Sequence, residues 1–334
     1  MNFPLAIAIL AASCAISALL IIVLRPALQR YALARPNARS SHVTPTPQGG
    51  GIAVIAATIA AAVIFGLIIP LTFDAAFLSL LAATICLATV GALDDLRPMP
   101  VLPRFTLQAI AVGVILATLP EQLHLIKSIP LWVERAILLL GGLWFVNLVN
   151  FMDGLDWMTV AEIVPITVAL GAIGFYEILP TVPMLIAIAL GGATIGFAFF
   201  NRPVAKLFLG DVGSLPIGLL VGWCLLQLAG SGHLIAAVLL PLYYLADATI
   251  TLLRRLTKGE AIWVAHRSHF YQRATDNGFS VLQVVTNVFL LNVTLAVLAM
   301  LTLLIASPYM DIFALVAGIG CVALVLNRFS RRRV

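Results

Sequence analysis

The sequence predicts an all-α integral membrane protein that forms one polytopic domain over residues 1–334. Of its residues 62% are hydrophobic and only 10% are charged, whereas a soluble protein carries about 25% charged residues. Apolar runs long enough to cross a bilayer fill most of the chain. The four cysteines lie inside these runs without CxxC spacing, so they support neither a disulfide framework nor a zinc knuckle. The net charge of +5 does not imply nucleic-acid binding.

The apolar runs divide into about eleven spans. A spanning helix needs about 20 mainly apolar residues, and Pro120, Pro180, Gly230 and Pro308 stand where such helices would be interrupted. The spans are expected near residues 4–24, 51–70, 75–93, 105–120, 131–150, 159–178, 182–200, 214–230, 233–253, 280–304 and 309–327.

Cationic residues orient this array. Of the nineteen Lys and Arg residues, seventeen lie in one set of alternate loops, and only Lys127 and Arg135 lie in the other set. Loops rich in Lys and Arg stay on the cytoplasmic side. The amino terminus is therefore predicted outside and the carboxyl terminus inside.

Acidic residues gather in the same loops. Seven of the fourteen Asp and Glu residues lie in loops or span ends on the predicted cytoplasmic side: Asp94, Asp95, Asp153, Asp156, Asp211, Glu260 and Asp276. We therefore expect an active site at the cytoplasmic face, assembled from segments far apart in the sequence.

Two of these segments come early in the chain. Residues 44–51 end in three glycines, which would let the backbone approach a phosphate at a helix start, or would only permit a close helix crossing. Asp94 and Asp95 stand together at the inner end of the third span. Adjacent carboxylates at a membrane boundary suggest bound Mg²⁺, a general base or both, and the alternative is a solvated helix end.

Two more segments carry oxygen ligands suited to a hard cation. Residues 147–157 contain Asn150 and Asp153 on one helical face, and Gly154 permits a turn that brings Asp156 round. An ordinary helix C-cap would explain the glycine but not the two acids. Asp211 lies between glycines at the start of the eighth span, where it is either a metal ligand or an N-cap.

The fifth segment is the longest predicted cytoplasmic loop, which holds His266, Arg267, His269 and Arg273. This cationic surface suits a diphosphate, or one histidine could act as an acid or base. A membrane-surface helix with aromatic anchors is the alternative. Asp247 lies within the ninth span and should face the bundle interior, because a charge in lipid is costly.

In this order, the motifs resemble those of the polyprenyl-phosphate N-acetylhexosamine-1-phosphate transferases, the MraY/WecA-like members of glycosyltransferase family 4. The resemblance spans nearly the whole chain. It rests on Ser41-His42 with the glycines ending at Gly51, Asp94-Asp95, Asn150-Phe-Met-Asp153-Gly-Leu-Asp156, Gly210-Asp211-Val-Gly-Ser214, Asp247 with Arg254-Arg255, and His266-Arg-Ser-His269.

The resemblance implies transfer of a sugar 1-phosphate from a UDP-sugar to undecaprenyl phosphate, with release of UMP, at the bacterial inner membrane. It implies Mg²⁺, with Mn²⁺ as an alternative, and a homodimer is a further expectation. By analogy Asp211 and Asn150 bind the metal, Asp94 and Asp95 activate or position the lipid phosphate, Asp153 and Asp156 lie on the nucleotide side, and His266 and His269 contact the diphosphate or sugar. Other implied substrate contacts are His42, Gly50, Gly51, Asn147, Arg267 and Arg273.

Two departures from the family pattern bear on specificity. Trp157 follows Asp156 where the family commonly has glycine, and the last loop reads His-Arg-Ser-His in place of a histidine run. The second departure favours the WecA/WbpL side, which starts O-antigen-like glycans, over the peptidoglycan precursor (phospho-MurNAc-pentapeptide) transferase. A secondary transporter is the alternative from another class, but no halves repeat and the acids lie at one edge.

Overall fold

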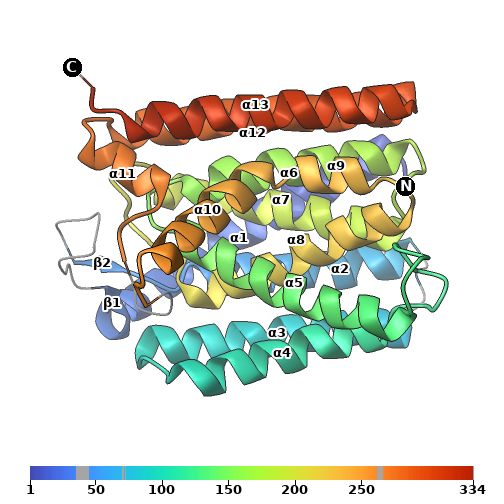
Figure 1. Cartoon of the computed structure of the whole chain (residues 1–334). Coiled ribbons are helices and arrows are strands. Elements are labelled where there is room, and N and C mark those ends of the chain that lie inside the picture. Colours follow the sequence, from blue (N-terminus) through green and yellow to red (C-terminus); the bar gives the residue numbers. More distant parts are fainter. Residues whose placement is uncertain (35–44, 70, 72, 262–265, 334) are drawn as a thin grey trace.

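The computed structural model describes residues 1–34, 45–69, 71, 73–261 and 266–333. They form a helical bundle with one small β-hairpin (Figure 1). The helices are α1 (Phe3–Tyr31), α2 (Gly51–Ile68), α3 (Ala75–Leu96), α4 (Val101–Ala117), α5 (Leu131–Met152), α6 (Met158–Phe175), α7 (Thr181–Asn201), α8 (Asp211–Gly230), α9 (Leu234–Leu239), α10 (Leu242–Thr257), α11 (Phe270–Asp276), α12 (Val281–Ile305) and α13 (Pro308–Ser330). Strands β1 (Leu33–Ala34) and β2 (Thr46–Pro47) pair antiparallel.

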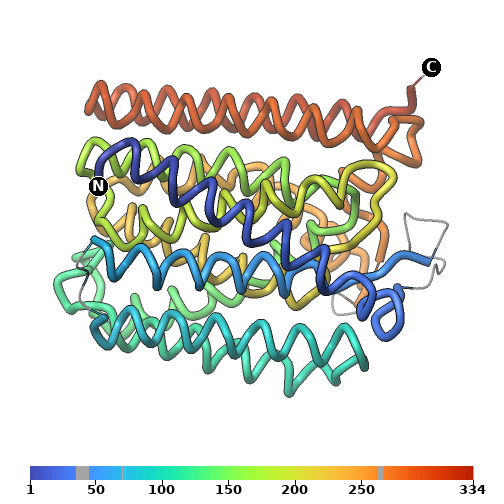
Figure 2. The backbone as a smooth tube through the Cα atoms, turned by 180° about the vertical axis from the view of Figure 1, so that it is seen from behind, coloured from blue at the N-terminus to red at the C-terminus, as the bar shows by residue number. Residues whose placement is uncertain are grey.

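The long helices lie roughly side by side, with α12 and α13 at one edge and α3 and α4 at the opposite edge (Figure 1). Helices α7 and α8 are the most buried, whereas α1 and α13 expose most of their apolar side chains. The amino terminus and the carboxyl terminus lie at opposite ends of the bundle, as the view from behind also shows (Figure 2). Opposite ends agree with an odd number of crossings.

Within the described residues, nine helices are long and apolar enough to cross a membrane, and α4 is a shorter apolar helix. The all-α membrane fold predicted from composition is therefore confirmed. The segment expected to span at 233–253 is helical but broken, because α9 and α10 are separate helices that meet at Leu240 and Pro241. Proline lacks a backbone N–H and clashes with the preceding turn, which ends a helix.

Small residues set the closest helix contacts. A Cβ at Gly192 of α7 would lie 2.3 Å from the Leu10 carbonyl oxygen of α1, and one at Gly196 would lie 2.4 Å from that of Cys14. The Ser13 hydroxyl donates to the Ala189 carbonyl at 2.7 Å across the same interface. Close backbone approach and interhelical hydrogen bonds hold helices together in lipid, where apolar burial alone gives no driving force.

Candidate active site

Side chains from three helix ends meet at the end of the bundle that also carries the β-hairpin and α11. They are Asp94 and Asp95 at the end of α3, Asn150 and Asp153 at the end of α5, and Asp211 at the start of α8. We call this end the acidic end. Antiparallel neighbours place the end of one helix beside the start of another, which is why residues over 100 positions apart become neighbours.

The centre of the acidic end is a group of five side chains joined by hydrogen bonds and ion pairs. The Asn150 amide donates to Asp211 Oδ1 at 2.7 Å and to the Ser214 hydroxyl at 2.9 Å. Arg104 of α4 places Nη1 2.8 Å from Asp94 Oδ2 and 3.9 Å from Asp211 Oδ2. A cation therefore bridges the carboxylates of Asp94 and Asp211.

The carboxylate of Asp95 binds different groups from those that Asp94 binds. Its Oδ1 accepts the Asp211 backbone N–H at 3.0 Å, and its Oδ2 accepts that of Val212 at 3.1 Å. These N–H groups belong to the first turn of α8 and have no partner within that helix. Asp95 thus caps α8 from another helix and fixes the backbone that carries Asp211.

Glycines let α3 and α8 come close enough for this contact. A Cβ at Gly91 would lie 2.2 Å from the Asp211 carbonyl oxygen, and a Cβ at Gly210 would lie 2.4 Å from Asp95 Oδ2. Gly210 also has a φ of +78°, in the left-handed region that favours glycine. A larger residue at Gly91 would collide with the backbone of α8, and one at Gly210 would displace the Asp95 carboxylate and strain its own backbone.

The loop between α5 and α6 carries Asp153 and Asp156. Asp153 accepts a hydrogen bond from the Thr159 hydroxyl, and Asp156 Oδ2 accepts one from the Ala205 backbone N–H at 2.9 Å. The Tyr271 hydroxyl donates a hydrogen bond to the Phe151 carbonyl at 2.9 Å, in the last turn of α5 just before this loop. Asp156 thereby ties this loop to the segment before α8.

Trp157 occupies the position where the resembling family commonly has glycine. Its φ is +62° with ψ 4°, a left-handed conformation that strains most side chains. Two hydrogen bonds of 2.7 Å hold it, from its backbone N–H to Asn201 Oδ1 and from its indole Nε1 to the Ala198 carbonyl. The backbone therefore adopts the shape a glycine would take, with the indole anchored on α7.

The acidic end holds more negative charge than Arg104 can balance. Burial, followed by the charges of Asp211, Asp95 and Asp156, raises the pKa of Asp153 to about 8. Clustered carboxylates of this kind bind a cation or share protons. Among the described residues no three His, Cys, Asp or Glu side chains form a metal site. The donor set fits an ion with few protein ligands, namely Asp211 and Asn150, and it does not fit a closed protein cage.

The segment before α11 is attached to α10 by Asp247, which is fully buried. Asp247 Oδ1 accepts the Phe270 backbone N–H at 3.0 Å and lies 3.2 Å from His269 Nδ1, while Oδ2 accepts the Tyr271 N–H at 3.1 Å. Asp247 therefore faces the bundle interior as expected, and it caps α11 as Asp95 caps α8.

The two histidines stack on each other, with ring centroids 4.9 Å apart. Burial, with the neighbouring His269 and the Arg255 charge, lowers the pKa of His266 to about 4. Neutral His266 places Nδ1 2.8 Å from the Ser268 hydroxyl. At neutral pH the ring therefore carries no charge, and it is a weak base that takes part in hydrogen bonds as the neutral imidazole.

Several predicted substrate contacts are engaged within the protein. The Asn147 amide is buried and donates to Gln108 Oε1 at 2.7 Å. Arg267 pairs with Asp276 at 3.2 Å on α11. A Cβ at Gly51 would lie 2.2 Å from the Gly213 Cα, and one at Gly50 would lie 2.7 Å from the Phe197 ring. For both glycines the structure favours the close helix crossing over the phosphate approach.

Two predicted contacts remain, Arg273 and His42, and the structure describes only the first. Arg273 lies in α11, where it makes no ion pair with another described residue. His42 lies outside the described residues.

Sequence reasoning missed Arg104 as a site residue. It counted this arginine only among the cytoplasmic cations, although Arg104 lies ten residues after Asp94 and begins a helix that must return beside α3. The signal available in the sequence was an arginine near the start of the helix that follows the Asp94-Asp95 pair.

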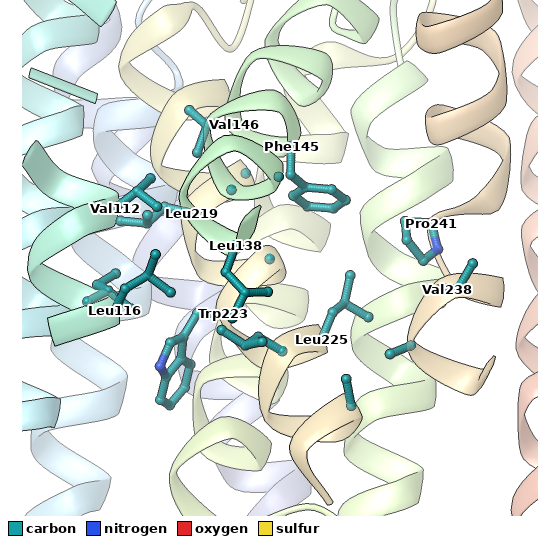
Figure 3. Close-up of a pocket in the computed structure, with 18 of the residues that line it drawn as sticks. Val112, Leu116, Leu138, Phe145, Val146, Leu219, Trp223, Leu225, Val238 and Pro241 are labelled. Atoms are coloured by element: carbon teal, nitrogen blue, oxygen red, sulfur yellow. The ribbon is translucent and has the colours of Figure 1, made fainter. Parts of the chain in front are cut away.

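An apolar groove of about 300 Å³ opens between α4, α5, α8, α9 and α10. Figure 3 shows Phe145, Val146, Leu219, Trp223 and Pro241 around it, and nearly all of its lining is carbon. Val146 lies one helical turn before Asn150, and Gly218, also in the lining, lies two turns after Asp211. The groove therefore ends close to the acidic end.

The fold defines a multi-pass α-helical membrane protein with a cluster of charged side chains at one end of its bundle. Residues 77–229, from α3 to α8, match the family described as Glycosyl transferase family 4, and they include Asp94, Asp95, Asn150, Asp153, Asp156 and Asp211. This match and the relatives described next support the polyprenyl-phosphate phospho-sugar transferase family for this chain. The secondary-transporter alternative is thereby set aside.

Relatives extend this similarity. The chain is 27% identical over 293 residues to the decaprenyl-phosphate N-acetylglucosaminephosphotransferase of Mycobacterium leprae, covering 78% of this chain and 74% of that protein. It is 26% identical over 286 residues to the probable undecaprenyl-phosphate N-acetylglucosaminyl 1-phosphate transferase of Bacillus subtilis, covering 79% and 77%. It is also 28% identical over 191 residues to the phospho-N-acetylmuramoyl-pentapeptide-transferase of Aquifex aeolicus, covering 51% and 52%.

Proposed function

We propose that this protein transfers N-acetylhexosamine 1-phosphate from a UDP-sugar to undecaprenyl phosphate, releasing UMP and starting an O-antigen-like cell-surface glycan. The observation that carries the proposal is the group formed by Asp94, Arg104, Asn150 and Asp211. It lies at an end of the membrane bundle beside an apolar groove. Such a place suits a reaction between a lipid-borne phosphate and a water-soluble phosphate donor.

The groove supports a lipid acceptor. A polyprenyl chain is apolar throughout and carries its phosphate at one end, so it needs an apolar path that ends at cationic or metal-binding groups. The groove lining provides the path, and Arg104 together with the Asn150–Asp211 pair lies one to two helical turns beyond it.

The relatives support an N-acetylhexosamine donor. Those named as N-acetylglucosamine phosphotransferases align with more than three quarters of the chain, whereas the relative named for the muramoyl-pentapeptide aligns with 51% of it. The His266-Arg-Ser-His269 segment also lacks a continuous histidine run. These two observations support a simple N-acetylhexosamine donor over the muramoyl-pentapeptide donor.

In the proposed reaction an oxygen of the lipid phosphate attacks the sugar-linked phosphorus of the UDP-sugar. Its electron pair forms the new P–O bond, and the bond to UMP breaks with its electrons remaining on UMP. Arg104 would bind phosphate oxygens, because a guanidinium presents paired N–H donors that match them. Asp94 holds Arg104 in place, and Asp95 holds the start of α8 so that Asp211 keeps its position.

Mg²⁺ is the proposed cofactor, with Mn²⁺ as the alternative. Asp211 and Asn150 are the residues that would hold it: their side chains are in contact through the Asn150 NH2 group, and rotation of that amide would present its oxygen beside the Asp211 carboxylate. When bound, the ion would offset the negative charge that converges on the phosphates.

The acidic end is proposed to face the cytoplasm of a bacterial inner membrane. The cations that follow the described helices support this orientation, because Arg254 and Arg255 end α10 and Arg328 ends α13 at the same end. UDP-sugars are cytoplasmic compounds, so this orientation gives the site access to its donor.

A panel of radiolabelled UDP-sugars tests the function. Purified protein with undecaprenyl phosphate should form a labelled lipid from UDP-N-acetylglucosamine or another UDP-N-acetylhexosamine and not from the UDP-muramoyl-pentapeptide. EDTA should stop the reaction, and added Mg²⁺ should restore it. Label transfer only from the muramoyl donor would replace the proposed substrate.

A substitution of Asp211 tests the metal assignment separately. Asp211→Asn keeps the size of the side chain but removes its charge, so turnover should fall at least about 100-fold and more Mg²⁺ should be needed. Glu260→Gln is the matched control, since Glu260 is an exposed acid that pairs with Arg255. An Asp211→Asn variant with unchanged Mg²⁺ dependence would remove Asp211 from the metal site.

A further inference from the structure

A second polar cluster lies inside the bundle, away from the groove and from the residues assigned to the reaction. Glu162 of α6 is fully buried, and Asn292 of α12 is 1% exposed. The Asn292 amide donates to Glu162 Oε2 at 2.5 Å and to the Ala161 carbonyl at 3.0 Å. A carboxyl group at this depth is costly and needs a reason.

The hydrogen bonds of this cluster are incomplete if Glu162 is ionised. Glu162 Oε1 and Asn292 Oδ1 are both buried acceptors without a donor among the described residues. Among the described residues, the charged group with an electrostatic effect on Glu162 is the acid Asp247, and no cation has such an effect. A single proton on Oε1 would give these two acceptors one shared hydrogen bond.

Glu162 also faces the start of α10. Because α10 begins after the break at Pro241, its first N–H groups lie inside the bundle without partners in their own helix. The Tyr244 backbone N–H belongs to this first turn and is directed at the Glu162 carboxyl. Asp247, which holds His269 and the start of α11, lies three residues further along α10.

We propose that Glu162 is a protonated carboxylic acid that pairs reciprocally with the Asn292 amide and, through Tyr244, positions α10. It is a positioning residue: it acts on the acidic end through Asp247 and His269 and touches neither substrate. Together with the Tyr244 N–H, the pair connects α6, α10 and α12 beside the break between α9 and α10.

Infrared difference spectroscopy tests the protonation state without any assay of activity. The purified full chain is compared with Glu162→Gln, which keeps the shape of the acid and can form the same reciprocal pair with Asn292. The C=O stretch of a protonated carboxyl should be present in the wild type and lost in this variant. A difference spectrum with only a carboxylate band would show that Glu162 is ionised and would overturn the proposal.

Kinetics test the positioning role, and this part rests on the proposed transferase function. Glu162→Ala should lower kcat/KM by about tenfold or more, mainly through a higher KM for the UDP-sugar, because small displacements of positioning groups are costly. Glu162→Gln should stay within about twofold of the wild type. Asn292→Ala, which removes the partner and keeps the acid, should resemble Glu162→Ala.

Thr167→Ala is the matched control. Thr167 is a buried polar residue of the same helix whose hydroxyl bonds only the carbonyls of Ile163 and Val164. A Glu162→Ala variant as active as Thr167→Ala would overturn the positioning role, and a Glu162→Gln variant as impaired as Glu162→Ala would overturn the neutral pair. If the wild type transferred no sugar from any donor, the proposed function would fail while the infrared result still decided the pair.

Discussion

Neighbouring carboxylates at the acidic end differ in what their oxygens bind. Asp94 binds the Arg104 guanidinium through Oδ2 and the Met99 backbone N–H through Oδ1, whereas Asp95 binds two backbone N–H groups of α8. The sequence places the two acids side by side and treats them alike. Their difference follows from helix geometry, since consecutive residues of a helix point about 100° apart and reach different neighbours.

This difference predicts unequal effects of two matched substitutions. Asp95→Asn loses the charge and one of two acceptors at the start of α8, so it should cost about 1–2 kcal/mol of stability as well as activity. Asp94→Asn should reduce turnover with a smaller loss of stability, because its partner Arg104 is partly exposed. Thermal unfolding in detergent and the transfer assay measure both. Equal destabilisation by the two variants would contradict the capping role of Asp95.

Arg104 is expected to be the main protein cation at the phosphates. Arg104→Ala should reduce turnover by at least about 100-fold, the usual scale for losing a positioned charge. Arg104→Lys should recover part of the rate, since it restores the charge but not the paired donors. Arg97→Ala removes an exposed cation of the same loop and should leave the rate near that of the wild type. Wild-type rates in Arg104→Ala would exclude the residue from the site.

The pH profile should be independent of His266. Its pKa of about 4 means that the folded protein keeps this side chain neutral as the pH falls from 7 to 5. Because the pKa is lower in the folded than in the unfolded protein, His266 weakens stability as the pH falls from about 6.5 towards 4. His266→Gln should therefore leave the acid limb of the rate profile unchanged and lessen the loss of stability at acid pH. A shifted acid limb would show that His266 titrates during turnover.

At the scale of helices, the acidic end is held together by side chains that bind the starts of other helices. Asp95 of α3 caps α8, and Asp247 of α10 caps α11. A carboxylate at a helix start pairs with free N–H groups and with the positive end of the helix dipole. Each cap thus fixes a helix that carries a candidate active-site residue.

Close packing of α3 against α8 gives a sharp test of this arrangement. A Cβ at Gly91 would meet the Asp211 backbone, so Gly91→Ala should cost about 1–3 kcal/mol of stability and displace Asp211. Gly113→Ala in α4 is the matched control, because no atom lies within 4 Å of its added Cβ. The unfolding temperature and the turnover rate should both fall in Gly91→Ala, and both should stay at wild-type values in Gly113→Ala. An unimpaired Gly91→Ala would show that the two helices can separate without loss.

At the scale of the whole molecule, the two termini lie at opposite ends and the acidic end carries the carboxyl terminus (Figure 1). In a background without its four cysteines, a cysteine replacing Lys258 should resist a membrane-impermeant reagent added to intact cells, and one replacing Lys127 should react. The reverse labelling pattern would place the acidic end outside and would remove its access to cytoplasmic UDP-sugars.

Most of the bundle could be predicted from hydropathy, because lipid requires each crossing segment to satisfy its own backbone. The exception is the expected span at 233–253, which divides at Pro241. Its composition is as apolar as that of an unbroken helix. Only the neighbours of the break, Glu162 beside the Tyr244 N–H, show how a helix can begin inside the bundle.

The amino-acid sequence by itself determined that this protein is a helical membrane protein and which polar segments distinguish it, since both depend on residue types and their order. Only the tertiary structure decided which of those residues meet. It joined Asn150 to Asp211, brought Arg104 to Asp94, and turned Asp95, Asn147, Gly50 and Gly51 to packing and capping. The physical reason is that a side chain's partner is set by how helices cross and where they begin, and these depend on contacts between segments distant in the chain.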